Sequence, residues 1–401
     1  MGMLRAPGPI RTFAAITLVN TIGNGLLATV VVLYFTHVVG LGGGQVGVGL
    51  TVAGVFGVVV GVPVGHLADR RGPREVLAGI LVCEVAAVAL YVVTRSFVAF
   101  LVVAALVVTL NRAESAVRQG FIAQALPPAD RVRGRAVLRS VTNVGFAIGS
   151  GIAALAIVID TRAAYDTLIL GDAASYALAL VLTLRLPHVP PQPPAAEGPR
   201  LVVLRDRPYL AVMALVAIMT LHYSLLDVGI PLWIGHTDAP RVTVGIVFFI
   251  NCVLVAALSV PMARGSETVS GAARVAVLAA VLLAASCVVF ALSGAVAGAA
   301  TAALVVVTAA VVEVFGEMTQ AASSWGLSFG LAPEDAQGQY QGLASSCYAL
   351  AAMLGPALMA AIVALGTAGW LAFGALFLAA GFATVPVSTW AEDRRRGAVR
   401  V

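Results

Sequence analysis

Twelve long apolar runs constrain the fold of this chain more than any other feature of its sequence. A helix needs about 20 apolar residues to cross a bilayer, and hydrocarbon offers no partner to an unpaired backbone group. The runs are too long for barrel strands, so we expect an all-α polytopic membrane protein. The predicted transmembrane helices span 12–39, 46–66, 75–95, 97–126, 136–160, 165–187, 209–234, 242–263, 273–294, 296–331, 339–365 and 368–390.

Composition excludes a soluble fold for the 401 residues. Hydrophobic residues make up 60% of the chain, charged residues only 11%, and the mean hydropathy is +0.99. A soluble globular domain carries about 25% charged residues. The four cysteines stand singly within apolar runs, so neither disulfides nor a metal site is expected.

A proline-rich, charged stretch separates the sixth run from the seventh and predicts a linker. We expect an N-terminal six-helix bundle over 1–187, a cytoplasmic linker over 188–208, and a C-terminal six-helix bundle with a short cytoplasmic tail over 209–401. The halves also resemble each other. A shift of 205 residues aligns "LPPADRVRGRAVLRS", from Leu126, with "LAPEDAQGQYQGLAS", from Leu331, and each stretch joins the fourth and fifth helix of its half. Such internal repeats are common in transporter folds.

The arginines predict the orientation of the chain. Only Arg95, Arg162 and Arg241 fall in the loops of one side, whereas most of the others lie on the opposite side. Because cytoplasmic loops are enriched in basic residues, we expect both termini and the linker in the cytoplasm. This placement explains the basic pI without nucleic acid as a partner. The lack of lysine and the abundance of Ala, Val and Gly suggest a GC-rich bacterial genome, so the predicted location is the bacterial inner membrane.

The stretch "GHLADRRGPR", residues 65–74, resembles the signature loop of the major facilitator superfamily, roughly G-x-L-a-D-r-x-G-r-r, between the second and third helices. The matching residues are Gly65, Leu67, Asp69, Arg70, Gly72 and Arg74. The resemblance implies two pseudo-symmetric six-helix bundles and a cytoplasmic latch that holds the halves in the outward-open state. Candidate partners of Asp69 are Arg118 and the start of the eleventh helix. A role confined to shaping the loop is the alternative.

Within the superfamily, the chain resembles the twelve-helix bacterial drug/proton antiporter-like branch, with departures. The second-half loop "VPMARGSET", from Val260, keeps Pro261, Arg264 and Gly265 but has no aspartate. The fifth helix reads "GFAIGSG" where such antiporters usually carry G-x-x-x-G-P, so the proline is missing. These departures weaken the antiporter assignment and leave the fold untouched.

Polar residues within the spans gather on the first, fourth, seventh and tenth helices, which the resemblance implies line the central cavity. Such residues are costly in lipid and usually face a cavity. The cavity and substrate candidates are Asn20, Asn24, Arg112, Glu114, His222, Tyr223 and Gln320. Glu114 and Arg118 are four residues apart, so we expect an ion pair along their helix. Arg112 points elsewhere and is a candidate partner for Asp227 or a glutamate of the tenth span.

Asp227, Glu313 and Glu317 are the candidates for proton coupling. Glu313 and Glu317 lie one turn apart, so in a low dielectric they are not expected to be ionised together. A solvated position at the helix end is the alternative, above all for Glu317. Glu84 and Asp172, on helices expected at the periphery, are predicted to be polar bridges within the bundle.

Gly229 and Pro231 are expected to kink the seventh span just beyond Asp227.

The sequence contains neither a phosphate-binding P-loop nor an H-E-x-x-H motif, so it supports neither ATP-driven pumping nor zincin chemistry. We therefore expect a secondary active transporter and not an enzyme. Its first candidate function is proton-coupled export of hydrophobic or amphipathic small molecules by alternating access. Proton-coupled or facilitated uptake of a small metabolite is the alternative. No cofactor is expected, because the proton gradient supplies the energy. The expected partners are a small-molecule substrate, protons and the lipid bilayer, and the chain is expected to act as a monomer.

Overall fold

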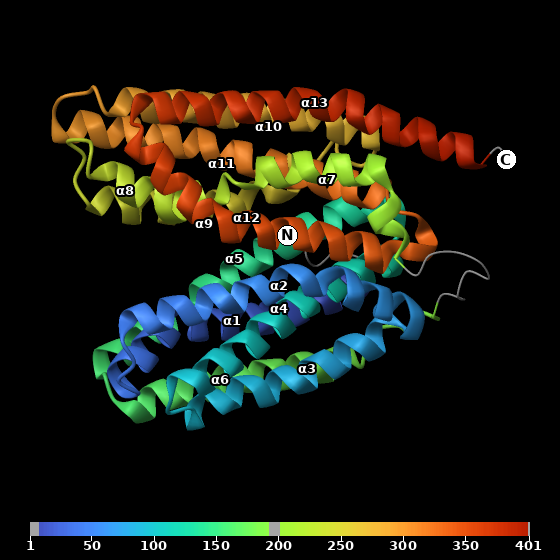
Figure 1. Ribbon diagram of the computed structural model, residues 1–401, viewed down its shortest axis with the longest axis horizontal. Helices are drawn as coiled ribbons and strands as arrows, with labels where there is room; N and C mark the ends of the chain where they lie inside the picture. Colours follow the sequence, from blue (N-terminus) through green and yellow to red (C-terminus); the bar gives the residue numbers. More distant parts are fainter. Residues whose placement is uncertain (1–7, 192–200, 400–401) are drawn as a thin grey trace. The chain divides into compact units, whose positions relative to one another are not determined.

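The computed structural model describes residues 8–191 and 201–399, and the regular structure within them is helical. Twelve segments are long and apolar enough to cross a membrane, which confirms the predicted all-α, twelve-span architecture (Figure 1). The middle of the predicted linker, residues 192–200, lies outside the described residues. The chain divides into two compact units.

Unit 1 comprises Met1–Pro127, Val137–Val202 and Ala332–Ala349. Its helices within the first half of the chain are α1 (Gly8–Leu33), η2 (Tyr34–Val38), α2 (Gly43–Arg71), α3 (Pro73–Leu90), η3 (Tyr91–Val93), α4 (Phe97–Ala125), α5 (Pro128–Ile159) and α6 (Arg162–Thr183).

Unit 2 comprises Pro128–Ala136, Val203–Leu331 and Leu350–Val401. The helices of the second half of the chain are η4 (Val202–Arg205), α7 (Arg207–Thr220), η5 (Leu225–Gly229), α8 (Ile230–Ile234), α9 (Val242–Met262), α10 (Val269–Ser293), α11 (Ala299–Gly330), η6 (Glu334–Ala336), α12 (Gln337–Ala364) and α13 (Thr367–Val399).

Two helices contribute residues to both units. The start of α5, Pro128–Ala136, belongs to unit 2, and Ala332–Ala349, which includes the start of α12, belongs to unit 1. These are the segments that the 205-residue shift relates. The sequence predicts connecting loops there, but both stretches are largely helical. Pro128 fits the first turn of a helix and Asp130 is favourable near its positive end, so the helix begins well before the apolar run does.

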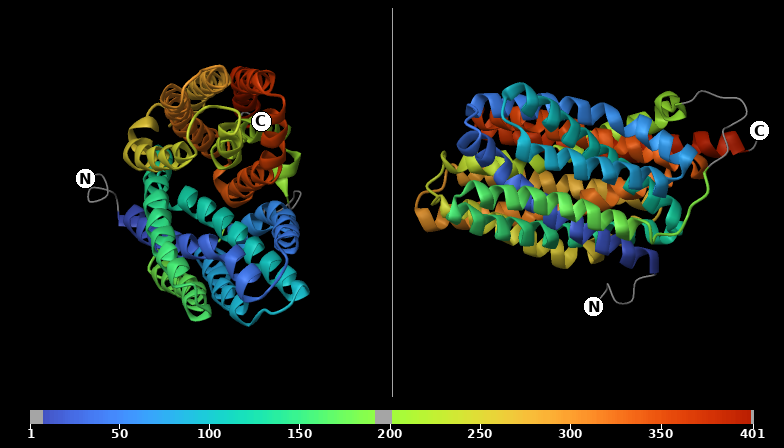
Figure 2. Two further views of the ribbon diagram at one scale, coloured as in Figure 1. Left: turned by 90° about the vertical axis from the view of Figure 1, so that its left-hand side faces the viewer. Right: turned by 90° about the horizontal axis from the view of Figure 1, so that it is seen from below.

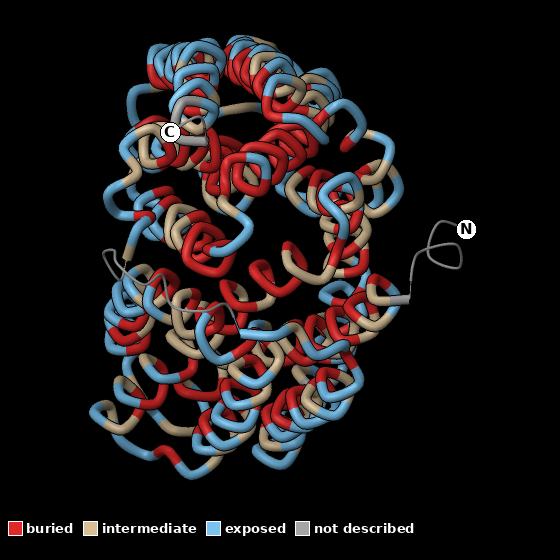
Figure 3. The backbone as a smooth tube through the Cα atoms, turned by 90° about the vertical axis from the view of Figure 1, so that its right-hand side faces the viewer, coloured by how far each residue is buried: buried red, intermediate tan, exposed pale blue. Residues whose placement is uncertain are grey.

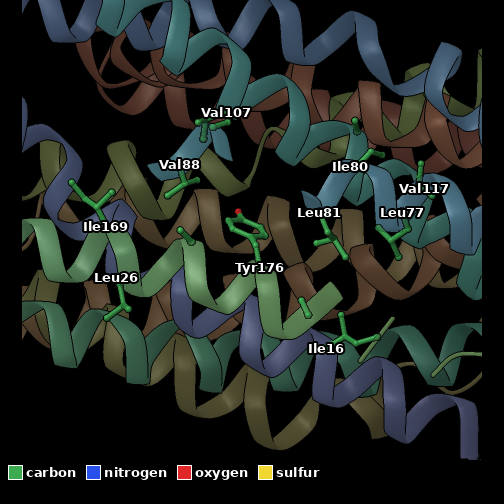
Figure 4. Packing of buried hydrophobic residues seen from close by; sticks show 14 of the residues in the cluster. Ile16, Leu26, Leu77, Ile80, Leu81, Val88, Val107, Val117, Ile169 and Tyr176 are labelled. Atoms are coloured by element: carbon green, nitrogen blue, oxygen red, sulfur yellow. The ribbon is translucent and has the colours of Figure 1, made fainter. Parts of the chain in front are cut away.

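The interior of unit 1 is a continuous cluster of aromatic and aliphatic side chains. Within it α2 packs on α4, α1 on α6, and α3 on both α4 and α6. Figure 4 shows Tyr176 among the aliphatic side chains of neighbouring helices. Within the cluster the ring centres of Phe35 and Phe100 lie 4.4 Å apart. Large apolar residues such as Val59, 68% exposed, cover the outer face, as expected of a surface in contact with lipid.

Unit 2 is built around α10, which packs on α11 and α13, while α9 contacts α11 and α7 contacts α13. Trp370 is fully buried and stacks on Phe290 with their ring centres 4.9 Å apart. The end-on view in Figure 2 shows the helices of each unit as a bundle. The outer faces are largely exposed and the inner faces largely buried (Figure 3).

The seventh span is interrupted earlier than the sequence predicts. A kink was expected at Gly229 and Pro231, but α7 already ends at Thr220, and a turn at Leu221 and His222 precedes the π-helical η5. Proline clashes with the carbonyl of the residue four positions earlier, here Asp227, and a wider π turn relieves that clash. The disturbance therefore extends upstream of the proline.

Candidate functional site

The signature loop closes a tight turn between α2 and α3. Gly72 has φ 91°, in the left-handed region that favours glycine, and Pro73 begins α3 directly after it. Arg74 lies in the first turn of α3 and donates to the carbonyl of Leu184, at 2.7 Å, at the end of α6. Arg70 is exposed. The glycine and Arg74 thus fix the turn.

Asp69, near the end of α2, contacts the first turn of α12. Its Oδ1 accepts from the amide of Gly338, at 2.8 Å, and its Oδ2 from the amide of Gln339, at 3.0 Å. These amides lack partners within their own helix, and the positive end of a helix attracts a carboxylate. The amide of Gln124 donates to Oδ1 at 2.9 Å, and Asp69 is 4% exposed. Two partners were considered for Asp69, Arg118 and the start of the eleventh span. Asp69 contacts the second of these, which is the start of α12.

Glycines let α12 approach this closely. A Cβ atom at Gly65 would meet the carbonyl oxygen of Gly338, and one at Gly61 would meet that of Gly342. A Cβ at Gly120, on α4, would lie 2.9 Å from the Cα of Gly338. We call Gly65, Asp69, Gly120, Gln124 and Gly338 the glycine seam. Sequence reasoning missed Gly338 and Gly342, although their four-residue spacing matches that of Gly61 and Gly65.

Arg118 pairs with Glu114, Nε to Oε1 3.5 Å, as expected for residues four apart on a helix. Arg112 lies against Gly57. A Cβ atom added at Gly57 would be 2.9 Å from the Cγ atom of Arg112. The expected pairing of Arg112 with Asp227 or a glutamate of α11 would join residues of different units, and it stays a prediction.

A chain of hydrogen bonds runs through the middle of unit 1. Asn24 donates to Oδ1 of Asn20 at 2.8 Å, and its own Oδ1 accepts from the hydroxyl of Tyr176, at 2.8 Å. Asn111 donates to that hydroxyl at 3.2 Å. The structure thus joins the polar residues of the first and fourth spans through Tyr176, which sequence reasoning missed. Its position four residues after Asp172 on an apolar helix was the available signal.

Three buried carboxylates, those of Glu84, Glu114 and Asp172, lie close enough in unit 1 to interact electrostatically. Each is at most 3% exposed, and Arg118 is the cation beside them. Ser175 lies 3.4 Å from Oδ1 of Asp172. Glu84 and Asp172 are therefore inside the bundle, although their helices were expected at its periphery. Asp172 accepts from Ser175, but neither carboxylate oxygen of Glu84 has a hydrogen-bond partner among the described residues, so the predicted bridge is absent there.

In unit 2 the turn that interrupts the seventh span places His222 against α11. A hydrogen bond of 2.9 Å joins Nδ1 of His222 to Oε1 of Glu313, and the side chains are 0% and 1% exposed. The ring centres of Tyr223 and His222 lie 4.2 Å apart. Glu313 is near the middle of α11, so this pair lies far from either end of the helix.

Two further hydrogen bonds extend this arrangement along α11. Asn251, on α9, donates to Oε2 of Glu317 at 2.7 Å, and Gln320 donates to the hydroxyl of Thr220 at 3.2 Å. Glu317 is 4% exposed, so it does not occupy a solvated helix end. We call His222, Glu313, Asn251, Glu317, Thr220 and Gln320 the α11 polar cluster. Sequence reasoning missed Asn251 and Thr220, since their pairing depends on how α9 and α7 pack against α11.

Asp227 is close enough to Glu317 of this cluster to interact with it electrostatically. It lies on η5 and is exposed, whereas Glu313 and Glu317 are buried. No group of three or more His, Cys, Asp or Glu side chains suited to a metal ion occurs within the described ranges. The α11 polar cluster contains one imidazole and two carboxylates in an apolar bundle. It is suited to binding and releasing a proton.

Comparison with known proteins supplies the wider context. Residues 13–356 match the family model described as Major Facilitator Superfamily. The human organic anion transporter MFSD10 (TETRAN) is similar in structure, with a TM-score of 0.72 at 15% identity over 94% of this chain and 100% of that chain. A bacterial homologue of the iron transporter ferroportin, in an outward-facing state, has a TM-score of 0.72 at 13% identity over 96% of this chain and 100% of that chain. No curated protein matches the sequence. The comparisons confirm the predicted major facilitator fold.

Proposed function

Because this chain belongs to the Major Facilitator Superfamily and is a multi-pass membrane transporter, we propose that it exports hydrophobic or amphipathic small molecules in exchange for protons. The observation that supports this most directly is the buried pair of His222 and Glu313 at the interruption of the seventh span. Interrupted helices often form the substrate and coupling-ion sites of secondary transporters.

The charge of the pair links proton and substrate. With a neutral imidazole and an ionised carboxylate, the pair carries one negative charge in an apolar bundle, which is costly. One proton makes the pair neutral wherever on the pair it binds. A positively charged amphipathic substrate near the pair would stabilise the same negative state, so proton and substrate compete. Such competition is what exchange requires.

The other acidic residues have supporting roles in this proposal. Glu317, whose Oε2 accepts from Asn251, is an auxiliary proton site one turn along α11. Asp227 is exposed on η5 and serves as the point of proton entry or exit. We assign the cavity candidates of unit 1, Asn20, Asn24 and Arg112, to substrate contact.

Transport assays test the proton-coupled role. Everted vesicles that contain the full chain should export ethidium when a pH gradient is imposed, and Glu313→Gln and His222→Gln should each reduce that transport at least about tenfold. Glu267→Gln, an exposed loop carboxylate, is the matched control and should transport normally. Full gradient-driven transport in both cluster variants would refute the assignment.

The accumulation of ethidium in whole cells tests the direction of transport. Cells that make the protein should accumulate less ethidium than cells without it, and an uncoupler should abolish the difference. Accumulation above that of the empty cells would favour proton-coupled or facilitated uptake instead.

We further propose that the glycine seam is a gate. Asp69 binds the first turn of α12, and α12 continues from residues of unit 1 into residues of unit 2 beyond Ala349. Release of that turn would free α12 to move during alternating access. Maleimide labelling of an Asn20→Cys reporter should become faster when Asp69→Asn is added, and unchanged labelling would contradict the gating role.

A further inference from the structure

A basic pocket lies where the start of α7 meets the last turns of α13. The cavity has a volume of about 580 Å³, and all of its lining residues belong to unit 2. The charged and aromatic side chains that line it are Arg205, Asp206, Arg207, Trp390, Arg394 and Arg395. Figure 1 shows the start of α7 and the C-terminal end of α13 at the same end of their bundle. The proposed transport route uses none of these residues.

The pocket carries a net positive charge. Its one carboxylate, Asp206, accepts from the amide of Tyr209 at 3.1 Å, as the N-cap of α7, and pairs with Arg395 at 2.8 Å. Arg205, Arg207 and Arg394 are exposed, and none of them forms an ion pair with another described residue. Three guanidinium groups are thus available at the cavity. Arginine binds phosphate oxygens with two parallel hydrogen bonds, so the pocket fits a phosphate group.

The pocket also lies where the membrane should end. The candidate spans Arg207–Ile234 and Thr367–Arg396 each have one end at it. Trp390 is 41% exposed and lines the cavity together with Pro208 and Ala391, so apolar side chains border the arginines. Tryptophan is enriched at the level of lipid headgroups. An apolar border beside a basic cavity matches a ligand with a phosphate head and a hydrocarbon chain.

We propose that this pocket binds the headgroup of an anionic phospholipid. Arg205, Arg207 and Arg394 hold the phosphate, and the first part of an acyl chain lies along Trp390. Basic pockets at the cytoplasmic ends of transmembrane helices bind such headgroups. The volume leaves room for a headgroup with more than one phosphate, so cardiolipin is the best probe and phosphatidylglycerol the second.

Lipid binding to the purified full chain in detergent tests the proposal. Added cardiolipin should raise the Tm, and native mass spectrometry should show bound cardiolipin in preference to phosphatidylcholine of the same acyl chains. In the triple variant R205Q/R207Q/R394Q the affinity for cardiolipin should fall at least about tenfold, because each arginine near an anionic surface contributes independently. The control R11Q/R185Q/R274Q removes the same charge from exposed positions outside the pocket and should bind as the unaltered protein does.

Three results would overturn the proposal. The two triple variants could bind cardiolipin equally, or phosphatidylcholine could bind as tightly as cardiolipin. Inorganic phosphate or glycerol phosphate could raise the Tm as much as the lipid does, which would assign the pocket to a soluble anion instead. If the glutamine variant does not fold, R205K/R207K/R394K keeps the charge and should retain binding. A folded lysine variant that does not bind cardiolipin would count against the proposal as well, because its three positive charges remain.

Discussion

The two segments related by the 205-residue shift are held in place by different chemistry. In unit 1 the start of α12 lies against glycine and the carboxylate of Asp69. In unit 2 the start of α5 contributes Arg135, whose guanidinium lies over the ring of Trp325 at 5.5 Å. Trp325 is the counterpart of Gly120 under the same shift. One repeat position therefore holds a glycine that allows close approach in one unit and a tryptophan in the other.

The difference continues along the same helices. Gln124, which donates to Asp69, corresponds to Phe329, which is 4% exposed in unit 2. The loop after α9 keeps a glycine with positive φ, Gly265 at 86°, but has no aspartate. Both loops thus contain a glycine turn with positive φ, whereas only the loop after α2 contains the aspartate. At these two segments, the start of α12 depends on close approach between backbones, whereas the start of α5 includes a cation–π contact, a geometry that tolerates small shifts.

The largest effect should follow from adding one methyl group to the glycine seam. In Gly338→Ala the new Cβ would meet the carbonyl oxygen of Gly65 and lie 2.5 Å from Oδ1 of Asp69. Overpacking costs about 1–3 kcal/mol and occasionally more. Because the clash here is with a backbone carbonyl, we expect a loss of at least about 3 kcal/mol and a fall in the Tm of several degrees in detergent.

Gly79→Ala is the matched control for that substitution. A Cβ at Gly79, in the interior of α3, would meet nothing within 4 Å. Alanine favours a helix interior over glycine by up to about 1 kcal/mol, so this variant should be as stable as the unaltered protein or more so. Equal losses in the two variants would remove close approach as the explanation of the seam.

Asp69→Asn should have the next largest effect. The amide keeps one oxygen acceptor but turns an NH₂ group toward one of the two backbone amides of α12, which are donors themselves. Hydrogen bonds to a charged group contribute about 1.5–3 kcal/mol, so we expect a loss in that range by thermal unfolding. Asp393→Asn, an exposed carboxylate on α13, should leave the Tm unchanged. A loss no greater than that of the control would mean that shape alone holds the start of α12.

Arg135→Gln tests the unit 2 side of the comparison, because it removes the cation–π contact with Trp325. A cation–π contact contributes about 0.5–2 kcal/mol depending on its exposure. Arg135→Lys keeps the charge over Trp325 and should lose less than the glutamine variant. If Arg135→Lys loses as much stability as Arg135→Gln, the charge over Trp325 does not stabilise the start of α5.

The sequence predicted the elements of this comparison better than their contacts. Asp69 and the start of the eleventh span were paired as candidates because a carboxylate and a helix N-terminus attract each other wherever they meet. The pairing of His222 with Glu313 was out of reach, since it depends on where the seventh span is interrupted and on how α7 packs against α11. Asn251 and Tyr176 were missed for a related reason, because each acts through a hydrogen bond to another helix, Asn251 to Glu317 and Tyr176 to Asn24.

The smallest effect should come from Gln124→Leu, which removes one neutral donor from Asp69 and matches the apolar character of Phe329 in unit 2. The loss should be about 0.5–1.5 kcal/mol, since the two backbone amides of α12 still bind the carboxylate. The double variant with Asp69→Asn shows whether the residues act as one unit. If Gln124 acts only through Asp69, the double variant should lose clearly less stability than the sum of the single losses, because the second substitution removes a bond that the first has already weakened. Strictly additive losses would show that Gln124 stabilises α4 independently, and the seam would then consist of Asp69 and the glycines alone.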